Sequence, residues 1–496
     1  MTAPTSAFTG LPVLVAGAGV SGRSATQALL AAGAAVTVTD ADAGRLAELE
    51  SLRAAGAVLT PGLDRPPAGT RLVVTSPGWR PTTPLLAAAA ASGIEVIGEV
   101  ELAWRLDQAA PEGPARWLVV TGTNGKTTTV GMLEAVLRAA GCDAVACGNV
   151  GLPVVDAVRA GHRVLAVELS SFQLHWSPSV RPYAGAVLNI AEDHLDWHGS
   201  LEAYAQAKAR ALTGEVAVAG LDDGHAARLL ARAPAPRRVG FTLGEPAPGQ
   251  LGVRDGALVD RAFSAEPEGE VLAAVADVRP AGPPGLLDAL AAAALARAHG
   301  VPAAAVRDGL RAYRPGAHRA AVVATVDGVT YVDDSKATNP HAAAASLRGA
   351  LPAGPRPDGA RVVWLAGGLL KGASVDELVA EVVPLLRGVV LLGTDRDRIA
   401  AALARHAPDI PVHEVGRGDH EAMVEAVRVA RTMAREGDVV LLAPAAASMD
   451  MFRDYGHRGR VFGEAVRALV AEGGDRDGPG ESPRPEPPGP PGGEAR

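Results

Sequence analysis

The chain of 496 residues is poor in cysteine and aromatic residues and has no long apolar run. Its two cysteines, Cys142 and Cys147, form no CxxC pair and there is no second cluster, so neither a disulfide scaffold nor a zinc site is indicated. This usage fits a reducing cytoplasm, where we expect the protein. No stretch reaches the roughly 20 apolar residues of a membrane span. The run from Leu11 to Ala16 lacks a preceding basic region, so we interpret it as a first strand and not as a signal peptide.

An excess of basic charge is also absent. The net charge of -8 gives no reason to expect nucleic acid or an anionic membrane as a partner. Hydrophobic residues make up 48% and charged residues 21%, as in soluble globular proteins. The length is too great for one ordinary core and predicts about three domains.

Lysine and asparagine are the scarcest of the common polar residues. Four lysines stand among 47 basic residues, and there are four asparagines: Lys126, Lys208, Lys336, Lys371, Asn124, Asn149, Asn189 and Asn339. Arginine is used almost everywhere else, so the surviving lysines indicate places where arginine is chemically unsuitable. Lysine is a compact ammonium that can lose its proton and become a nucleophile, whereas arginine stays charged and planar. Chance survival is the alternative, but it does not predict that the lysines fall within motifs.

The stretch from Thr121 to Thr128 reads Thr-Gly-Thr-Asn-Gly-Lys-Thr-Thr. It follows the apolar run 117–120 and precedes a stretch with helical apolar spacing, so we predict a strand, a glycine loop and a helix. Loop N–H groups and the helix N-terminus would face a phosphate, Lys126 would supply a charge, and a Thr hydroxyl could ligate Mg²⁺. The first glycine of the common phosphate-loop pattern would fall at Val120, and an ordinary helix start is the alternative.

A second glycine turn lies near the N-terminus. The strand 13–16 leads into Gly17-Ala18-Gly19-Val20-Ser21-Gly22, and a second predicted strand, 35–39, ends at Asp40. This layout is typical of a dinucleotide-binding βαβ unit, although it could equally hold a nucleotide-sugar diphosphate or serve only packing. A further strand, 73–75, leads to Ser76-Pro77-Gly78, at the strand end where open α/β sheets bind ligands.

Clusters of proline and glycine predict the domain boundaries. We place them near 108–114 and at Arg314-Pro315-Gly316, which gives domains 1–110, 111–315 and 316–472. Alternating strand and helix signals predict an α/β protein, with a Rossmann-like N-terminal domain, a central P-loop ATPase-like domain and a Rossmann-like C-terminal domain. Asp255-Gly256 predicts a hairpin, and residues 288–298 predict a helix. The stretch 473–496 is rich in Pro, Gly, Glu and Arg, so we expect a disordered tail.

Polar residues follow several predicted strands. Glu168 and His194 come after strands downstream of the phosphate loop and could converge on a nucleotide-bound Mg²⁺, although each could also be a helix cap. Lys208 lies in a helical stretch, where a surface lysine would be unremarkable. In the third segment the polar stretches are 333–340, the loop 367–372 and the stretch 444–459. They place polar groups on one edge of a sheet.

In combination these motifs resemble the Mur ligases, over Leu11 to about Leu469. The resemblance rests on the two glycine turns, Gly-Asn-Val-Gly (148–151), Glu-Leu-Ser-Ser-Phe-Gln-Leu (168–174), Asp-His-Leu-Asp (193–196), Asp-Asp-Ser-Lys-Ala-Thr-Asn (333–339) and Pro-x-x-x-Ser (444–448). The stretch 333–339 with the Gly-Gly-x-x-Lys-Gly loop is similar to the members of the family that add D-glutamate. The family implies a three-domain ligase in which ATP phosphorylates a carboxylate of a UDP-sugar and an amine then attacks the acyl phosphate.

The resemblance also implies partners and residue roles. The substrates would be UDP-N-acetylmuramoyl-L-alanine and D-glutamate, the cofactors ATP and Mg²⁺, and the protein a monomer. ATP would contact Gly122, Thr123, Asn124, Gly125, Lys126, Thr127, Thr128, Arg319 and Asp334. The metal ligands would be Thr127, Glu168, His194 and a carbamylated Lys208, and the catalytic residues Lys126, His194, Lys208 and Lys336. The UDP-sugar would contact Gly19, Ser21, Asp40, Ser76, Pro77, Gly78, Asn149 and Ser170, and D-glutamate Lys336, Thr338, Lys371, Ser448 and Tyr455.

The chain departs from the family pattern in several places. Near the expected adenine site, Pro284-Gly285 stands where the family tends to show His-Asn, and Asp288 stands where it shows Asn. Ala41-Asp42 stands in place of the Thr-Arg expected by the uracil, and Tyr455 stands where the family usually shows Phe. The alternatives are a sister ligase of the folylpolyglutamate synthase type, an NAD-dependent oxidoreductase and a non-catalytic nucleotide-binding protein. The sister ligase is disfavoured by the stretch 333–339, and the oxidoreductase by the phosphate loop, which would then have no role. The non-catalytic protein is disfavoured by the intact set Lys126, Glu168, His194 and Lys208.

Overall fold

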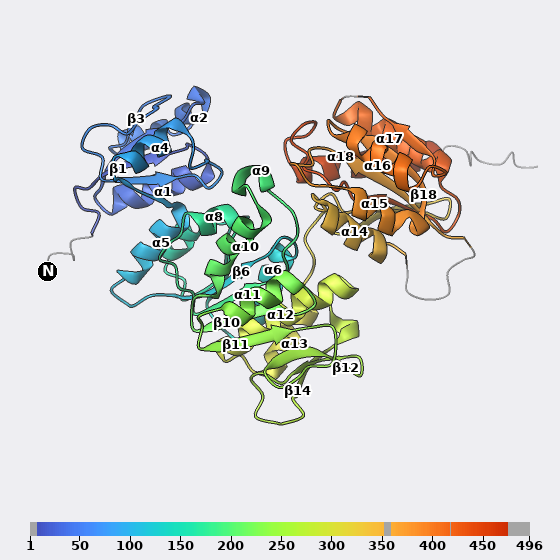
Figure 1. The fold of residues 1–496 in the computed structure, drawn as a ribbon, viewed down its shortest axis with the longest axis horizontal. Helices are drawn as coiled ribbons and strands as arrows, with labels where there is room; N and C mark the ends of the chain where they lie inside the picture. The colour runs from blue at the N-terminus through green and yellow to red at the C-terminus, as the bar shows by residue number, and fades with distance from the viewer. Residues whose placement is uncertain (1–6, 352–358, 417, 475–496) are drawn as a thin grey trace, which may run out of the picture. The chain divides into compact units, whose positions relative to one another are not determined.

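The computed structural model describes residues 7–351, 359–416 and 418–474 (Figure 1). By their contacts these residues form two units, of which the first runs to Gly316 and also takes in residues 371–373. The first unit contains two sheets and the second unit contains one. Helices flank each sheet in Figure 1, and the α/β class predicted from the sequence is confirmed.

The first sheet is built from residues 12–98. Its strands are β1 (Pro12–Ala16), β2 (Ala35–Thr39), β3 (Val58–Leu59), β4 (Leu72–Thr75) and β5 (Glu95–Gly98). Its helices are α1 (Val20–Ala31), α2 (Ala43–Ala47), α3 (Glu50–Ala54) and α4 (Pro84–Ala91), and α5 (Glu99–Gln108) follows β5. The strands are all parallel, in the order β3-β2-β1-β4-β5, so that their carboxyl ends share one edge. The predicted strands 13–16, 35–39 and 73–75 are confirmed.

The second sheet, built from residues 116–274, is the largest. Its strands are β6 (Arg116–Thr121), β7 (Ala144–Gly148), β8 (Val164–Glu168), β9 (Ala184–Val187), β10 (Val216–Gly220), β11 (Arg237–Phe241), β12 (Gln250–Arg254), β13 (Ala257–Asp260) and β14 (Glu270–Ala274). They lie in the order β14-β13-β12-β11-β10-β9-β6-β8-β7, and only the pairs formed by β13 are antiparallel. Asp255 and Gly256 both have positive φ in the β12–β13 turn, which confirms the predicted hairpin.

Helices on both faces of this sheet bury its central strands. They are α6 (Lys126–Ala139), α7 (Val154–Arg159), α8 (Ser171–His175), α9 (Leu195–His198), α10 (Leu201–Ala209), α11 (Gly224–Arg232), α12 (Pro283–His299) and α13 (Ala303–Ala312), with 3₁₀ turns at Arg210–Leu212 and Val275–Asp277. Helix α6 packs against α12 and α13, and their apolar side chains form one core with the sheet. Residues 117–121 of β6 are all buried, as expected for a parallel strand covered on both faces. The predicted helix 288–298 lies within α12.

The second unit holds the third sheet. Its strands are β15 (Ala321–Val326), β16 (Val329–Asp333), β17 (Val362–Gly367), β18 (Leu386–Leu392), β19 (Val412–Glu414) and β20 (Val439–Leu442). Its helices are α14 (Pro340–Gly349), α15 (Asp376–Val382), α16 (Arg396–His406), α17 (His420–Met433) and α18 (Tyr455–Gly474), with a 3₁₀ turn at Val383–Leu385. The order is β15-β16-β20-β17-β18-β19, and only β15 is antiparallel to its neighbour, so the sheet is mostly parallel, as the predicted Rossmann-like domain requires.

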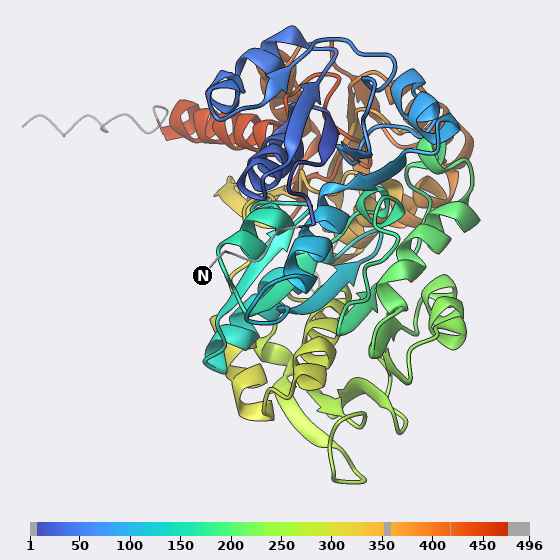
Figure 2. The same ribbon diagram turned by 90° about the vertical axis from the view of Figure 1, so that its left-hand side faces the viewer.

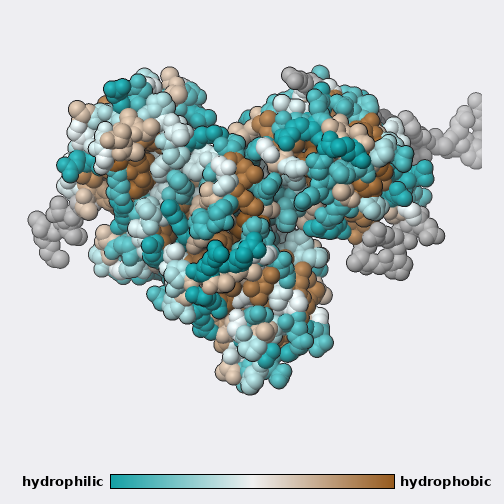
Figure 3. Space-filling model, in the orientation of Figure 1, coloured by the Kyte–Doolittle hydropathy of each residue, from teal (hydrophilic) through white to brown (hydrophobic). Residues whose placement is uncertain are grey.

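The long helix α18 ends the described chain and is drawn in red in Figure 2. Helix α18 includes residues 473 and 474, and the rest of the predicted tail lies outside the described residues. Hydrophilic residues cover much of each unit on the face shown in Figure 3. Within the described part of the chain, every helix is either too short or too polar to cross a membrane.

Candidate functional site

The glycine loop joins β6 to α6, which confirms the predicted strand–loop–helix order. Gly125 precedes the helix with a φ of 85°, and Gly122 has a φ of 158°. A Cβ at Gly125 would lie 2.1 Å from Asp288 Oδ1. Only glycine fits this left-handed, crowded position. The loop therefore brings its backbone against α12, with the N-terminus of α6 directly behind it.

The Lys126 side chain folds back over this loop. Its Nζ donates hydrogen bonds to Gly122 O at 3.0 Å and to Thr123 O at 2.9 Å. The positive charge is thereby held beside the loop N–H groups and the helix N-terminus, the arrangement that favours a bound phosphate.

Asn189, just after β9, fixes the other side of the loop. Its Oδ1 accepts a hydrogen bond from Asn124 N at 2.9 Å, and its carbonyl accepts one from Thr123 N at 3.0 Å. Sequence reasoning gave Asn189 no role, although its scarcity in this chain was an available signal. Asn189 thus holds the loop after β6 against the carboxyl end of β9.

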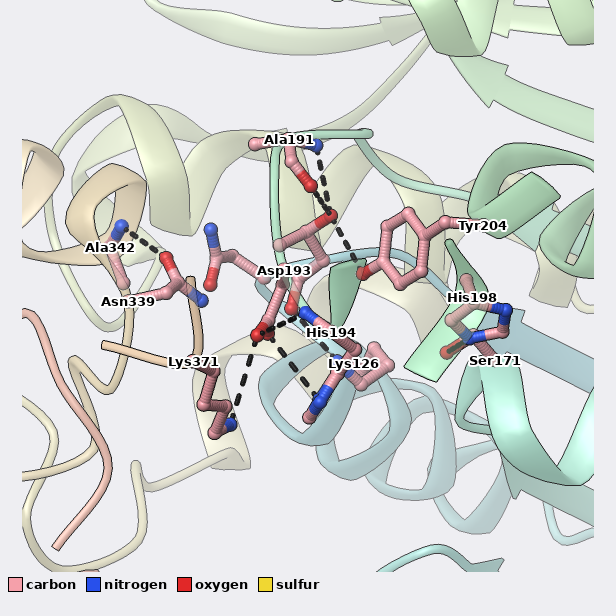
Figure 4. Close-up of polar contacts among 12 residues, drawn as sticks. Lys126, Ser171, Ala191, Asp193, His194, His198, Tyr204, Asn339, Ala342 and Lys371 are labelled. Carbon is pink, nitrogen blue, oxygen red and sulfur yellow. Dashed lines mark hydrogen bonds and ion pairs between the residues drawn. The ribbon is translucent and has the colours of Figure 1, made fainter. Parts of the chain in front are cut away.

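Thr123 connects the loop to α10. Its hydroxyl lies 3.0 Å from the Tyr204 hydroxyl and accepts a hydrogen bond from Ala191 N at 2.9 Å. Figure 4 shows Ala191 and the Tyr204 ring at the far ends of these contacts. These bonds hold α10, and with it Lys208, against the phosphate loop.

Lys208 is 1% exposed, so the interpretation of an ordinary surface lysine is wrong. Its Nζ donates to Gly122 O at 2.8 Å and lies 3.4 Å from Thr121 Oγ1 and 4.6 Å from the Tyr204 ring centroid. Burial, assisted by the charge of Lys126, holds the pKa of Lys208 well below its ordinary value of 10.5. The amine therefore exists largely uncharged at a lower pH than a surface lysine would require.

Glu168 ends β8 beside the loop and is 3% exposed. Its Oε1 accepts a hydrogen bond from Asn149 Nδ2 at 2.9 Å, and its carbonyl accepts one from Asn149 N at 2.8 Å. The charge of Glu168 acts on the Lys208 amine. Asn149 thus orients Glu168, and Ser170, two residues later, caps α8 through a hydrogen bond from Gln173 N.

His194 precedes α9 with a φ of 54°, and its ring centroid lies 4.6 Å from that of Phe172. Burial lowers the pKa of His194 to about 4, so its imidazole is neutral at pH 7. The charges of Lys208 and Lys126 act on it as well, which places His194, Lys208, Lys126 and Glu168 around one loop. No group of three His, Cys, Asp or Glu side chains in the described residues could hold a metal ion alone.

The first sheet brings its predicted residues to one edge. Asp40 accepts hydrogen bonds from Ala18 N at 2.8 Å and Asp42 N at 2.9 Å, so it orders the glycine turn. A Cβ at Gly17 would lie 2.2 Å from Ser76 Oγ, which shows how closely the turn meets the 76–78 loop. Gly19 caps α1 and Ser21 lies in its first turn. The side chain of Asp42 caps α2, which accounts locally for this departure from the family pattern.

The third sheet also gathers polar residues at one edge, after β16, β17 and β20. The Lys336 ammonium lies 3.8 Å from the centre of the Tyr455 ring, a cation–π contact. Ser448 is buried and its carbonyl accepts a hydrogen bond from Phe452 N at 2.8 Å. Thr338 lies just before α14, and Lys371 stands in the loop after β17 with a φ of 52°.

Arg319 and Asp334 lie at the beginning of the second unit. Burial raises the pKa of Asp334, and the Arg319 charge opposes that rise. The two residues predicted to contact ATP from this unit are therefore close enough to interact electrostatically.

Asp288 in α12 is 8% exposed and accepts a hydrogen bond from Thr129 Oγ1 at 3.2 Å. The aspartate that stands in place of the family's asparagine therefore lies at the contact between α12 and the phosphate loop. A Cβ at Gly285 would lie 1.9 Å from Pro280 O, so the first turn of α12 also requires its glycine.

Family models match all three sheets. The description "Mur ligase MurD-like, N-terminal domain" matches residues 12–98, "Mur ligase middle domain" matches 120–252, and "Mur ligase, glutamate ligase domain" matches 318–446.

Two curated relatives carry the name UDP-N-acetylmuramoylalanine--D-glutamate ligase. The protein from Rhodococcus jostii (strain RHA1) is 56% identical over 492 residues, which cover 93% of this chain and 96% of the relative. The protein from Nocardia farcinica (strain IFM 10152) is 56% identical over 483 residues, which cover 94% of this chain and 98% of the relative.

Solved structures share the fold at low sequence identity. The UDP-N-acetylmuramate-alanine ligase MurC from Thermotoga maritima has a TM-score of 0.56 and 18% identity, covering 92% of this chain and 99% of its own. The MurF ligase from Thermotoga maritima, in complex with ADP, has a TM-score of 0.56 and 16% identity, covering 88% of this chain and 95% of its own.

Proposed function

The chain belongs to the Mur ligase family, and we propose that it joins D-glutamate to UDP-N-acetylmuramoyl-L-alanine, with ATP as the energy source, in peptidoglycan precursor synthesis. The observation that carries the proposal is the 56% identity, over almost the whole chain, to relatives named for this reaction. We propose domain bounds at 110, 315 and 472. A cytoplasmic location and a monomeric state stay predictions.

The reaction has two steps. The alanyl carboxylate attacks the γ-phosphorus of ATP, the bond to the β,γ-bridging oxygen breaks, and ADP leaves. The neutral amine of D-glutamate then attacks the carbonyl carbon of the acyl phosphate. The bond from this carbon to the oxygen that it shares with phosphorus breaks, phosphate leaves with the electron pair of that bond, and the nitrogen loses a proton. Phosphorylation replaces a poor leaving group by a good one. The residues from Gly122 to Thr128 would hold the ATP phosphates, with Lys126 as the positive charge beside them.

The donor set of the loop fits Mg²⁺ held jointly by protein and phosphates. The Thr127 hydroxyl and the Glu168 carboxylate would ligate the Mg²⁺ of the nucleotide, since oxygen ligands are the ones that Mg²⁺ prefers, and the His194 imidazole would ligate a second Mg²⁺. Glu168 has only one side-chain hydrogen bond described, from Asn149, which leaves acceptor capacity on its carboxylate. When bound, Mg²⁺ supplies charge that offsets the negative charge developing on the phosphate oxygens.

We propose that Lys208 is carbamylated. Its neutral amine would attack CO₂ and release a proton, giving a carbamate with one negative charge. Burial beside Gly122 O and the lowered pKa support this, because CO₂ reacts only with the uncharged amine. Arginine cannot form this group, which accounts for a lysine at this position in a chain that otherwise uses arginine.

The remaining contacts are assigned from the loops that carry them. Gly19, Ser21, Asp40 and the stretch 76–78 would hold the UDP group at the edge of the first sheet, and Asn149 and Ser170 the sugar-peptide end. Lys336, Thr338, Lys371, Ser448 and Tyr455 would receive D-glutamate, and Arg319 and Asp334 would contact ATP.

The test of the function is phosphate release from ATP with a panel of amino acids. Release should require UDP-N-acetylmuramoyl-L-alanine and D-glutamate together. Turnover with L-lysine or meso-diaminopimelate in place of D-glutamate would overturn the assignment and favour a sister ligase.

The test of the carbamate is Lys208→Ala. This variant should be nearly inactive and should regain part of its activity with acetate or formate, but not with chloride at the same ionic strength. Lys208→Arg, which keeps a positive charge, should not be rescued. Full activity of Lys208→Ala would refute the carbamate role.

A further inference from the structure

Arg458 on α18 is 0% exposed, and its guanidinium donates hydrogen bonds in several directions. Nε donates to Ser335 Oγ at 2.9 Å, and Nη2 donates to Ser335 O at 2.9 Å. Nη1 donates to Ala446 O at 3.1 Å and reaches Gly367 O at the longer distance of 3.5 Å. One side chain thus contacts three separate segments of the second unit.

These segments are the loops that follow β16, β17 and β20, and each carries side chains assigned above to D-glutamate. Ser335 adjoins Lys336, Gly367 ends β17 directly before the loop that carries Lys371, and Ala446 lies two residues before Ser448. The loops are also joined by the backbone: Leu369 N donates to Ala447 O and Ala447 N to Leu369 O, both at 2.9 Å. Arg458 adds side-chain hydrogen bonds to all three.

Burying a guanidinium this completely is costly unless its donors are satisfied. The charges of Asp450 and Asp333 act on it, but its described hydrogen bonds go to neutral oxygens. A planar fork of five N–H donors can hold several oxygens at fixed spacing, which a single ammonium cannot. A buried guanidinium therefore suits a site where three backbone segments must be held at fixed spacing.

We propose that Arg458 is a positioning residue: its guanidinium fixes the spacing of the three loops that receive the incoming amino acid. The inference rests on the proposed function, which assigns these loops to D-glutamate. Misplacing a binding group by about 1 Å can reduce the reaction rate by roughly a hundredfold, so loosening the loops should be visible in the steady-state kinetics.

The kinetic test compares Arg458→Met and Arg458→Lys with wild type. The KM for D-glutamate should rise at least tenfold in Arg458→Met and by a smaller factor in Arg458→Lys, while the KM for the UDP-sugar stays within twofold. A KM for D-glutamate within twofold of wild type, or an equal rise in both KM values, would overturn the proposal. If Arg458→Met does not fold, Arg458→Lys decides by the same criteria.

Arg387 provides a matched control in the same unit. It lies at the amino end of β18, on the opposite edge of the sheet, and pairs with Asp438, with Nη2 3.0 Å from Asp438 Oδ1. Its side chain is 16% exposed. Arg387→Met should destabilise the unit without changing the KM for D-glutamate, and a rise comparable to that of Arg458→Met would refute a specific role for Arg458.

Hydrogen exchange separates this inference from the proposed function, because it needs no substrate. In Arg458→Met the exchange of the peptides covering 334–339, 367–370 and 444–448 should rise more than that of the other peptides of the second unit, whereas in Arg387→Met these three peptides should show no such excess. Unchanged exchange in these peptides would overturn the positioning role. If wild type does not turn over D-glutamate, the proposed function fails, and the exchange result still decides whether Arg458 orders the loops.

Discussion

Gly125→Ala is the substitution that tests most sharply how the phosphate loop is held. The new Cβ would lie 2.1 Å from Asp288 Oδ1, where ordinary contacts begin near 3.4 Å, so the two atoms must separate by about 1.3 Å. A φ of 85° costs an alanine about 1–2 kcal/mol. Displacing Asp288 also breaks its hydrogen bond from Thr129, worth about 1 kcal/mol.

The summed destabilisation of Gly125→Ala is therefore about 2–3 kcal/mol, and the shifted loop should reduce kcat/KM for ATP about a hundredfold. The control is Gly141→Ala, whose φ is 78° but whose Cβ meets nothing within 4 Å. It should show the backbone strain alone and keep kcat/KM near that of wild type. Both variants are compared by steady-state kinetics and thermal unfolding.

The double variant Gly125→Ala/Asp288→Ala isolates the clash. Gly125→Ala should lower the free energy of unfolding less in the Asp288→Ala background than it does in wild type, because the carboxylate that meets the new Cβ is gone. Equal effects of Gly125→Ala and Gly141→Ala on both stability and kcat/KM would refute the argument that the loop is seated against α12.

Two further predictions concern buried groups of the first unit. Burial raises the pKa of Glu99 from 4.5 to about 7, so the folded state binds its proton more tightly, and the free energy of unfolding should fall by about 3 kcal/mol as the pH rises from 4.5 to 7. Thermal midpoints at pH 5 and 7.5 should show this fall in wild type and a smaller one in Glu99→Gln; equal falls would contradict it. Tyr204→Phe removes the hydroxyl beside Thr123 and should lower the stability against urea by about 1 kcal/mol, whereas no loss would mean that this contact contributes nothing.

The parallel sheets and their strand-end loops were predictable because their signals are local. Apolar runs such as 117–120 are typical of strands buried on both faces, and glycines mark the loops that follow them. Strand β15 was not predicted, although Asp327-Gly328 between β15 and β16 is the same hairpin signal as Asp255-Gly256. Strand β19 was missed because it has only three residues.

The contacts that organise the site were less accessible from the sequence. Helix α10 shows no apolar stripe that would predict the burial of Lys208, which depends on the loop and on Tyr204 packing over it. Asn189 and Arg458 bond to the backbone of residues distant in sequence, Asn124 and Ser335, so no local pattern reveals these partners. Residue scarcity was the useful signal, because it pointed to Lys208 before its environment was visible.

The enzyme couples the cleavage of ATP to ADP and phosphate with the formation of one amide bond between D-glutamate and the UDP-sugar. Mass spectrometry of the UDP-sugar product, with ADP and phosphate measured in the same reaction, tests it directly. One D-glutamyl amide should form for each ADP and each phosphate released. Phosphate release without the amide, or amide formation with AMP and pyrophosphate, would contradict it.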